Sequence, residues 1–340
     1  MYGQPLGIIW HERFREISFS HPMIRDISKK RISEFRERVS SLTNVMFITP
    51  RPAPIDALYE VHDKGLIERI MEASKLPYIG FLDSGDTVHY PGMFEDVLLV
   101  AGSALTAIEM SNYLKTIYVP LGGFHHATKY NSMGFCPIND VNLTINRLMN
   151  LKQKVAVLDV DAHHPNGVEE MFYEKPVLKI SIFAYDGSFF PGTGDPRRRG
   201  DKEGKGLNYN VALPLGAADD SFEEALRMLR LLEEYDPSYL VVIAGVDGHK
   251  DDGLKSLNLT SNSYNLLGYK ISKLFGRRET RIISFGGGGY GQGSALSMYS
   301  FVLGLQGFLK KEEVPTQDFE KRHEVKKLVD SFLEGFSSSL

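Results

Sequence analysis

The 340-residue sequence predicts an α/β fold, with a parallel sheet covered by helices on both faces in one domain over residues 1–340. Short apolar, β-branched segments recur along the chain, and most of them lack the polar alternation of a half-exposed strand. Amphipathic segments lie between several of them, as in proteins that alternate strands and helices. No internal repeat or long linker interrupts this pattern.

Eight segments are predicted to be strands: LGIIW (6–10), NVMFIT (44–49), TIYVPL (116–121), KVAVLDV (154–160), VLKISIF (177–183), LNYNVAL (207–213), YLVVIAGV (239–246) and TRIISFGG (280–287). Helices are expected over 31–42, 94–115, 221–235 and, packed on the domain at its C-terminal end, 314–338. Ser221 and Glu224 would form a capping box for the third helix. The Gly/Pro-rich piece 189–206 is expected to be a long surface loop.

The composition excludes several classes of protein. The formal net charge is −4 and the pI about 6.2, so no direct binding to nucleic acid is expected. Cys136 is the only cysteine, which rules out an internal disulfide and fits a reducing compartment. The sequence shows no secretory signal and no apolar run of the ~18 residues that span a membrane. We expect a soluble, cytoplasmic protein; the composition does not predict its oligomeric state.

Ionisable residues follow one of the predicted strands in the stretch LDVDAHHPNG. Asp159, Asp161 and His163 occupy alternate positions, so on an extended strand they would share one face. Ligands of open α/β sheets bind beyond the carboxyl ends of strands, where this trio lies. Neighbouring carboxylates repel each other unless a cation intervenes, and carboxylate plus imidazole suits Zn²⁺ or Fe²⁺. The alternative is a solvated turn with an incidental histidine.

A second candidate ligand, Asp247, follows the apolar segment YLVVIAGV. It would complete a two-aspartate, one-histidine set with the last two members of the trio. Three protein ligands leave an open position, as in catalytic metal sites. Taken alone, Asp247 could equally be a turn residue. We expect His249 on the surface, and Asp251 and Asp252 in a solvated loop.

Two glycine-containing stretches offer groups for acid–base chemistry. His125 and His126 follow a predicted strand and a Gly-Gly pair, and histidines on such a loop can face a cleft and move protons. A lone histidine is more often a satisfied polar residue. The stretch GGGGYGQG (286–293) lacks the lysine of a phosphate-binding loop. Its bare backbone would allow a close approach, and the Tyr290 hydroxyl could stabilise an oxyanion; the alternative is a turn with a packed tyrosine.

Taken together, these stretches resemble signatures of the histone deacetylase superfamily, which includes bacterial acetoin-utilisation proteins and acetylpolyamine amidohydrolases. The resemblance covers roughly residues 10 to 300, with the motifs in the family's order. The motifs are HPM (21–23), RPAP (51–54), EVHD (60–63), DTVHYPGMFE (86–95), GGFHHA (122–127), GFC-x-x-ND (134–140), DVDAHH (159–164), FFPGTGD (189–195), AGVD (244–247) and GGGGY (286–290).

The resemblance implies the arginase–deacetylase fold, a three-layer αβα domain with an eight-stranded parallel sheet. It implies hydrolysis of an acyl amide, typically an N-acetyl-lysine side chain in a protein or peptide. The metal, Zn²⁺ or alternatively Fe²⁺, would be held by Asp161, His163 and Asp247. It would polarise the acetyl carbonyl and activate a water.

The resemblance also implies roles for the other candidates. His126 would be the general base and the acid that protonates the leaving amine. His125 would be its electrostatic partner, hydrogen-bonded to Asp159. Tyr290 would donate a hydrogen bond to the tetrahedral oxyanion. A structural K⁺ ion would be bound by Asp159, Asp161, the main-chain oxygen of His163, Ser181 and Ile182.

The substrate-binding residues follow from the same resemblance. Asp86 corresponds to a rim aspartate that holds the substrate backbone. Phe135 and Phe190 correspond to the aromatic pair of the acyl-lysine tunnel, and Gly134 lies beside the first of them. Leu254 corresponds to an apolar position on the rim.

The sequence departs from the family pattern after the metal ligands. The usual His-His-Gly is here His163-His164-Pro165, and Asn166 follows. Proline fixes φ and removes a donor, so the loop could differ in shape. Asn166 is expected to hydrogen-bond His126, and a neutral amide should leave the histidine pKa lower than a carboxylate would. Arg31 corresponds to an inner-channel arginine, with a longer spacing after HPM.

Three functions compete at this point. The first is a deacylase of acyl-lysine in proteins or peptides. The second is an acetylpolyamine amidohydrolase, whose small cationic substrate would favour acidic groups around the tunnel mouth; no clear acidic gate is visible. The third is a non-catalytic acyl-lysine binding module, motivated only by Pro165. A ureohydrolase is disfavoured because the ligand motifs of its two-metal cluster are not evident.

Overall fold

The computed structural model describes residues 3–337, and its centre is an eight-stranded sheet. The strand order is β2-β1-β5-β10-β9-β6-β7-β8, and all neighbouring strands run parallel. The strands are β1 (Leu6–Ile9), β2 (Val45–Ile48), β5 (Thr116–Val119), β6 (Val155–Asp159), β7 (Leu178–Ala184), β8 (Asn208–Leu213), β9 (Tyr239–Ile243) and β10 (Arg281–Phe285). Each of the eight predicted segments supplies one of them, so the predicted parallel sheet is confirmed. A separate antiparallel hairpin, β3 (Gly80–Phe81) with β4 (Val88–His89), was not predicted.

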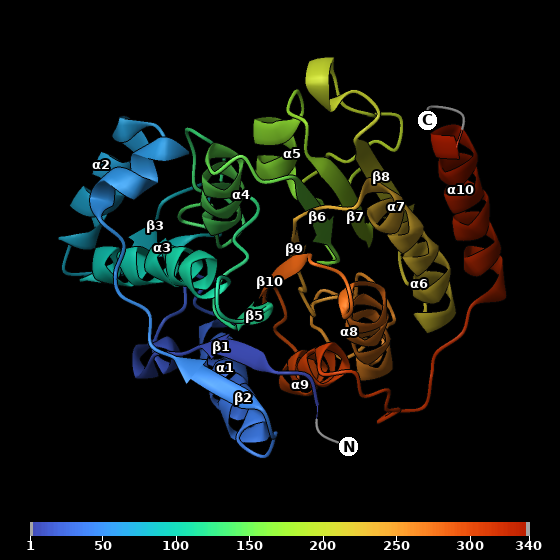
Figure 1. Ribbon diagram of the computed structural model, residues 1–340. Helices are drawn as coiled ribbons and strands as arrows, with labels where there is room; N and C mark the ends of the chain where they lie inside the picture. Colours follow the sequence, from blue (N-terminus) through green and yellow to red (C-terminus); the bar gives the residue numbers. More distant parts are fainter. Residues whose placement is uncertain (1–2, 338–340) are drawn as a thin grey trace.

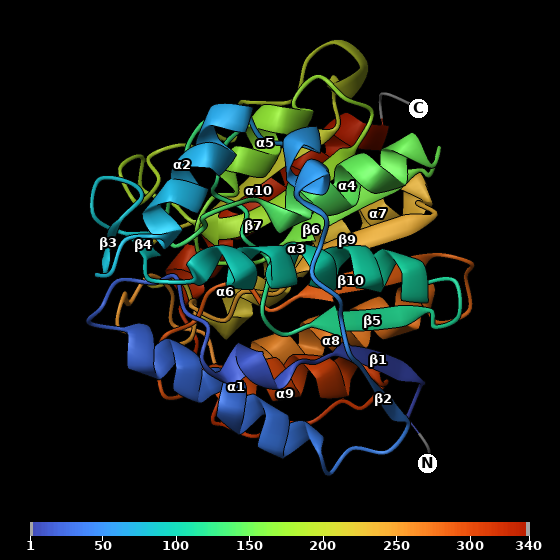
Figure 2. The same cartoon turned by 90° about the vertical axis from the view of Figure 1, so that its left-hand side faces the viewer.

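Helices cover both faces of the sheet (Figure 1). On one face lie α3 (Met93–Met110), α4 (Asp140–Asn150) and α5 (Asn166–Phe172), and α3 runs across the front in Figure 2. The other face carries α1 (Arg25–Val39), α8 (Ser261–Phe275) and α9 (Ser294–Leu305). The remaining helices are α2 (Lys64–Ser74), α6 (Asp219–Ala225), α7 (Leu229–Tyr235) and α10 (Phe319–Ser337).

Two apolar layers hold the sheet between these helices. In β6, Val157 faces the layer of α3 and α4, whereas Leu158 faces the opposite layer, which includes Phe35 of α1 and Phe301 of α9. Successive residues of a strand point to opposite faces, so a strand covered on both sides must be apolar throughout. This explains why the strand segments lack polar alternation. Within residues 3–337, no helix is both long enough and apolar enough to cross a membrane.

The boundaries of all four predicted helices differ from the prediction. α1 covers Arg25–Val39 where a helix was expected over 31–42, and α3 ends at Met110 where the end was expected at residue 115. The segment predicted as one helix over 221–235 is interrupted by a short 3-10 helix at Leu226–Met228. Its first part, α6, begins at Asp219, so the predicted capping box at Ser221 is wrong, and the Ser221 hydroxyl has no hydrogen-bond partner among the described residues. The Asp219 carboxylate instead accepts hydrogen bonds from the backbone N–H groups of Thr260 and Thr316, which sets the helix start.

The C-terminal helix begins later than expected. α10 starts at Phe319 rather than near residue 314, and Ser338, the predicted end, lies outside the described residues. The helix lies beside β8 and α6: the ring of Phe332 meets that of Tyr209 edge-on, with centroids 5.5 Å apart, and Asp330 pairs with Arg227 at 2.7 Å.

One buried carboxylate ties the long loop between β7 and β8 to the sheet. Glu169 of α5 accepts hydrogen bonds from Asn208 (2.9 Å) and Asn210 (2.8 Å) of β8, and it pairs with Arg198 of the loop and with His164. Burial alone would raise its pKa, but these partners outweigh burial and lower the pKa of Glu169 to about 2. This loop carries Phe189 and Phe190, which follow β7.

We expect Glu169→Gln to lower the free energy of unfolding by about 3 kcal/mol at pH 7, because the change disrupts a buried ionic network. A carboxyl group in an unfolded chain titrates near ~4.3, so the stabilisation from Glu169 is complete above that pH and is lost as the pH falls toward 2. Urea unfolding should therefore show a difference between wild type and variant that shrinks from pH 5 to pH 3. Glu170→Gln, the same change at the exposed neighbour, is the control. A difference independent of pH would contradict this account.

Candidate active site

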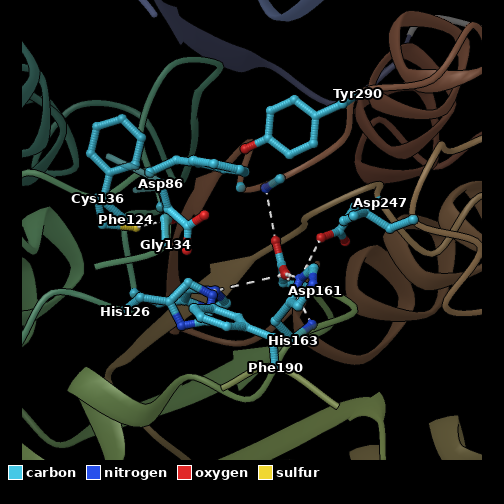
Figure 3. Close-up of a pocket in the computed structure, with 16 residues that line it drawn as sticks. Asp86, Phe124, His126, Gly134, Cys136, Asp161, His163, Phe190, Asp247 and Tyr290 are labelled. Atoms are coloured by element: carbon cyan, nitrogen blue, oxygen red, sulfur yellow. Dashed lines mark hydrogen bonds and ion pairs between the residues drawn. The ribbon is translucent and has the colours of Figure 1, made fainter. Parts of the chain in front are cut away.

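A cavity of about 240 Å³ opens at the carboxyl ends of four adjacent central strands. His125 and His126 follow β5, Asp161 and His163 follow β6, Asp247 follows β9 and Tyr290 follows β10; all six line the cavity. Figure 3 shows the labelled members of this set pointing into the same space. The strand order therefore gathers residues that are up to 165 positions apart (290 − 125) in the sequence.

The three predicted metal ligands lie together and are buried. The His163 Nδ1 atom is 2.8 Å from Asp247 Oδ2 and 3.1 Å from Asp161 Oδ1. The second oxygen of each carboxylate is taken by a backbone N–H: Gly288 donates to Asp161 Oδ2 at 2.7 Å, and Ala162 donates to Asp247 Oδ1 at 2.8 Å. One oxygen of each aspartate is left facing the imidazole nitrogen.

Asp159, Asp161 and His163 lie on two successive turns that begin at the end of β6 rather than on an extended strand. β6 ends at Asp159, whose Oδ1 atom accepts the Asp161 N–H, and Asp161 Oδ1 accepts the His163 N–H, both at 3.0 Å. The expectation that all three residues lie on one strand face was therefore wrong beyond Asp159. The turns separate the trio: two members meet Asp247, while Asp159 turns to His125.

The charges at this cluster fit a divalent cation. Burial, and then the negative charge of Asp161, raise the pKa of Asp247 to about 7. Two buried carboxylates this close repel each other, and a divalent ion would remove that conflict. Two carboxylate oxygens and one imidazole nitrogen, all within 4.8 Å of one another, form a set of three protein ligands for Zn²⁺ or Fe²⁺ with an open position.

The packing at this cluster explains why the loop after β10 contains glycine. A Cβ atom on Gly288 would lie 2.7 Å from Asp247 Oδ2 and 2.8 Å from Asp161 Oδ2. Any side chain there would collide with the two carboxylates. The sequence predicted that the glycine backbone would allow another group to approach closely. The groups that do so are the carboxylates of the candidate metal ligands Asp161 and Asp247.

The two histidines are held by different partners. His125 Nδ1 is 2.7 Å from Asp159 Oδ2, and His126 Nδ1 is 2.7 Å from Asn166 Oδ1. The two Nε2 atoms are 3.1 Å apart. The predicted contact between Asn166 and His126 is thus present despite Pro165, which immediately precedes α5 with φ −77° and leaves Asn166 as the first residue of that helix.

The partners give the two imidazoles opposite properties. Burial disfavours a charged His125, but the carboxylates of Asp159 and Asp161 outweigh it and raise the pKa of His125 to about 9. For His126, burial and then the charges of His125 and His163 lower the pKa well below its usual value. The Asn166 amide donates to the His126 carbonyl, so its oxygen must accept from Nδ1–H. This leaves His126 Nε2 as the proton-accepting atom.

Aromatic rings form the walls of the cavity. The Phe190 ring lies edge-on to His126, with centroids 5.1 Å apart, and the Phe135 ring lies edge-on to Tyr290 at 5.4 Å. Gly134 has φ +56°, and a Cβ atom there would lie 2.7 Å from the His126 ring, so only glycine fits between these walls.

Asp86 and Leu254 lie on the lining of the cavity as well. The Leu254 side chain is 48% exposed, so it forms part of the outer rim. Burial, and then the charge of Asp83, raise the pKa of Asp86. Ser181, one of the two β7 residues expected near K⁺, pairs with Asp159 in the register of β6 and β7, and Ile182 follows it.

Tyr290, the candidate hydrogen-bond donor to the oxyanion, lies in a loop that is held by the Arg31 side chain. The Arg31 guanidinium donates to the carbonyls of Gly289 at 2.8 Å and Gly287 at 2.9 Å, and it lies 5.2 Å from the centre of the Tyr290 ring. Burial raises the pKa of Tyr290, so its hydroxyl keeps its proton and can donate. The longer spacing after HPM thus still brings Arg31 to the site.

Some residues of the site were missed or misjudged. His249 was expected on the surface but is buried, and Asp252 was expected in a solvated loop but is buried and accepts the Tyr290 N–H at 2.6 Å. Phe189 stacks on His163 with centroids 5.0 Å apart, and only the double phenylalanine hinted at it. His164 does not line the cavity: its Nδ1 atom is 2.8 Å from Thr193 Oγ1 and its Nε2 atom is 3.1 Å from Glu169 Oε2.

Comparisons with known proteins agree with this arrangement. The family model of the histone deacetylase domain matches residues 21–303. A protein of Archaeoglobus fulgidus described as a probable deacetylase is 30% identical over 305 residues, which cover 85% of this chain and 82% of the relative. Human histone deacetylase 1 is 36% identical over 208 residues, which cover 59% of this chain and only 42% of the human protein.

The fold is shared with a solved structure. The crystal structure of the HDA15 HD domain matches with a TM-score of 0.83 over 98% of both chains, at 23% sequence identity. This likeness supports the fold, while the family model and the archaeal relative show the family. On these grounds the chain belongs to the histone deacetylase superfamily.

Proposed function

We propose that this protein is a metal-dependent amidohydrolase that removes the acyl group from acetyl-lysine in proteins or peptides. The observation that carries the proposal is the convergence of three metal ligands, a differentiated histidine pair and a tyrosine hydroxyl in one aromatic-walled cavity. The description of the archaeal relative as a probable deacetylase supports the same reaction. Asp161, His163 and Asp247 would hold Zn²⁺, with Fe²⁺ as the alternative. When bound, the ion supplies polarisation of the amide carbonyl and acidification of water.

The residues of the chain account for the remaining steps. His126 Nε2 accepts the proton of the attacking water and later returns a proton to the leaving amine. Burial, and then the charge of His125 beside Asp159, keep the pKa of His126 low enough for the first step. The Tyr290 hydroxyl donates to the oxygen that becomes an oxyanion. Phe135 and Phe190 enclose the methylene chain of the acylated lysine.

The rim favours a peptide over a small polyamine. Asp86 offers one carboxylate that can accept backbone N–H groups, and Leu254 adds an exposed apolar side chain. An acetylpolyamine has no peptide N–H groups for Asp86 to accept. The non-catalytic reading loses its motivation, because Asn166 keeps its bond to His126 although Pro165 precedes it.

We also propose a K⁺ site below the histidine pair, made of Asp159, Asp161, the His163 carbonyl, Ser181 and Ile182. The pairing of Asp159 with Ser181 across β6 and β7 supports it. A monovalent cation there would offset part of the negative charge that Asp159 and Asp161 bring into a buried region.

Hydrolysis of an acetyl-lysine peptide should exceed hydrolysis of N-acetylputrescine by about tenfold or more in kcat/KM. A hydrogen bond to a charged group such as Asp86 contributes ~1.5–3 kcal/mol, and 1.4 kcal/mol corresponds to a factor of ten. Acetate release by Zn²⁺-loaded protein measures both rates. Equal or higher efficiency on N-acetylputrescine would favour the polyamine function, and no turnover of any acyl amide would refute the proposal.

Replacing Tyr290 by phenylalanine should lower kcat by about 10²–10³, as the loss of one oxyanion donor does. KM should change little, because the hydroxyl acts mainly in the transition state. Steady-state kinetics on the acetyl-lysine peptide provide the measurement. Tyr113→Phe, the same change at a side chain that is 80% exposed, is the control. A kcat within a few-fold of wild type would remove Tyr290 from the mechanism.

Asn166→Asp should move the acid limb of the kcat/KM profile to higher pH by about 1–2 units. The new carboxylate would face His126 Nδ1 at the present 2.7 Å contact and raise the pKa of that histidine, which must be unprotonated to accept a proton. An aspartate is also favourable at the start of α5, so the fold should tolerate it.

The control for this change is Asn112→Asp, which adds the same charge at an exposed position shortly before β5, at the opposite end of the strands from the cavity. Its pH profile should match that of wild type. An unchanged profile for Asn166→Asp would show that His126 is not the group that titrates on the acid side.

A further inference from the structure

The buried carboxylate of Asp252 connects two separate parts of the candidate site. Its Oδ2 atom accepts the backbone N–H of Tyr290 at 2.6 Å, and its Oδ1 atom accepts the backbone N–H of Leu254 at 3.1 Å. The residue is 1% exposed. Burying a carboxylate is costly unless it is hydrogen-bonded, and hydrogen bonds to a charged acceptor are stronger than neutral ones. Asp252 therefore holds the main chain of the oxyanion donor firmly.

The segment that carries Tyr290 needs such an anchor. Four glycines precede the tyrosine, and glycine restricts the backbone less than any other residue. Side chains from outside the segment hold it instead: Asp161 accepts the Gly288 N–H, Arg31 donates to two glycine carbonyls, and Asp252 accepts the N–H of Tyr290 itself. Of these three, only Asp252 bonds to the residue that bears the hydroxyl.

The loop that carries Asp252 is itself braced from behind. The backbone N–H of Asp252 donates to the carbonyl of His249 at 2.8 Å. The His249 ring packs against Gly293 so closely that a Cβ atom on Gly293 would come within 2.2 Å of the ring. His249 Nε2 is 3.0 Å from Glu313 Oε2, and Glu313 Oε1 pairs with Lys250 at 2.8 Å. Glu313 lies beyond residue 303, where the match to the family model ends.

We propose that Asp252 is a positioning residue for Tyr290 in the hydrolysis, and that Glu313 braces the Asp252 loop through His249 and Lys250. The inference rests on the proposed deacylase function. It assigns to a segment outside the family match a role in placing the oxyanion donor.

Asp252→Asn should lower kcat by about 10- to 100-fold with little change in KM, because a displacement near 1 Å of a catalytic group costs up to that factor. The amide would turn either a poorer acceptor or an N–H toward the Tyr290 N–H. The same replacement in a Tyr290→Phe protein should have little further effect on kcat, since its target is already gone. Asp56→Asn, the same change at an exposed aspartate that does not line the cavity, should keep the wild-type kcat.

The brace is tested in the same way. Glu313→Ala should lower kcat several-fold when Tyr290 is present, and much less when it is introduced into the Tyr290→Phe variant. Glu312→Ala, at the exposed neighbour, serves as its control. Metal content should stay at the wild-type value in the Asp252 and Glu313 variants, because Asp247, His163 and Asp161 are unchanged.

A second readout does not depend on turnover. In protein labelled with 3-fluorotyrosine, the Tyr290 signal in the ¹⁹F NMR spectrum is identified by its loss in Tyr290→Phe. This signal should shift or broaden in Asp252→Asn and stay in place in Asp56→Asn. A wild-type kcat and an unmoved signal in Asp252→Asn would overturn the inference, as would an equal loss of kcat with and without Tyr290. Absence of activity in the wild type would refute the function, while the NMR comparison would still decide the positioning role.

Discussion

The structure depends on one constraint: two buried aspartates, Asp161 and Asp247, must both contact the His163 imidazole. Asp161 and Asp247 come from β6 and β9, and they can meet only because these strands are neighbours in the sheet. Backbone N–H groups fix one oxygen of Asp247 and both oxygens of Asp161, and one oxygen of each carboxylate lies against the His163 imidazole. The loop after β10 has glycine at position 288, because a side chain there would collide with both carboxylates. A divalent cation would offset the repulsion of two buried carboxylates held this close.

The sheet was predictable because most of its strands are buried on both faces; in β6, for example, every residue from Val155 to Leu158 is buried and apolar. The helix boundaries were less so, because distant contacts decide them. α6 begins at Asp219 since that carboxylate binds Thr260 and Thr316, which are far away in the sequence. Local capping signals at Ser221 cannot compete with such a tertiary contact. The short hairpin of β3 and β4 has two residues per strand, too few for any periodic pattern.

The candidate site was visible in the sequence where ionisable residues come within a few positions of an apolar strand, as at Asp161 and Asp247, or where a Gly-Gly pair precedes them, as at His126. Residues placed further along a loop escaped, since their burial depends on what covers the loop. His249 and Asp252 look like members of a solvated stretch, yet Gly293 lies against one and the Tyr290 N–H binds the other. The covering Glu313 stands 64 residues after His249, beyond the reach of any local pattern.

The position of β10 has a consequence for how the molecule assembles. This strand is the last of the sheet in the sequence, but it lies between β5 and β9 and forms the junction of the two halves β2-β1-β5 and β9-β6-β7-β8. Until Phe285 has been synthesised, the halves have no strand pairing with each other. The histidines after β5 therefore meet the candidate ligands after β6 and β9 only when the final strand inserts. Formation of such distant pairings is a slow step in folding, and a half-finished chain exposes two open sheet edges that invite aggregation.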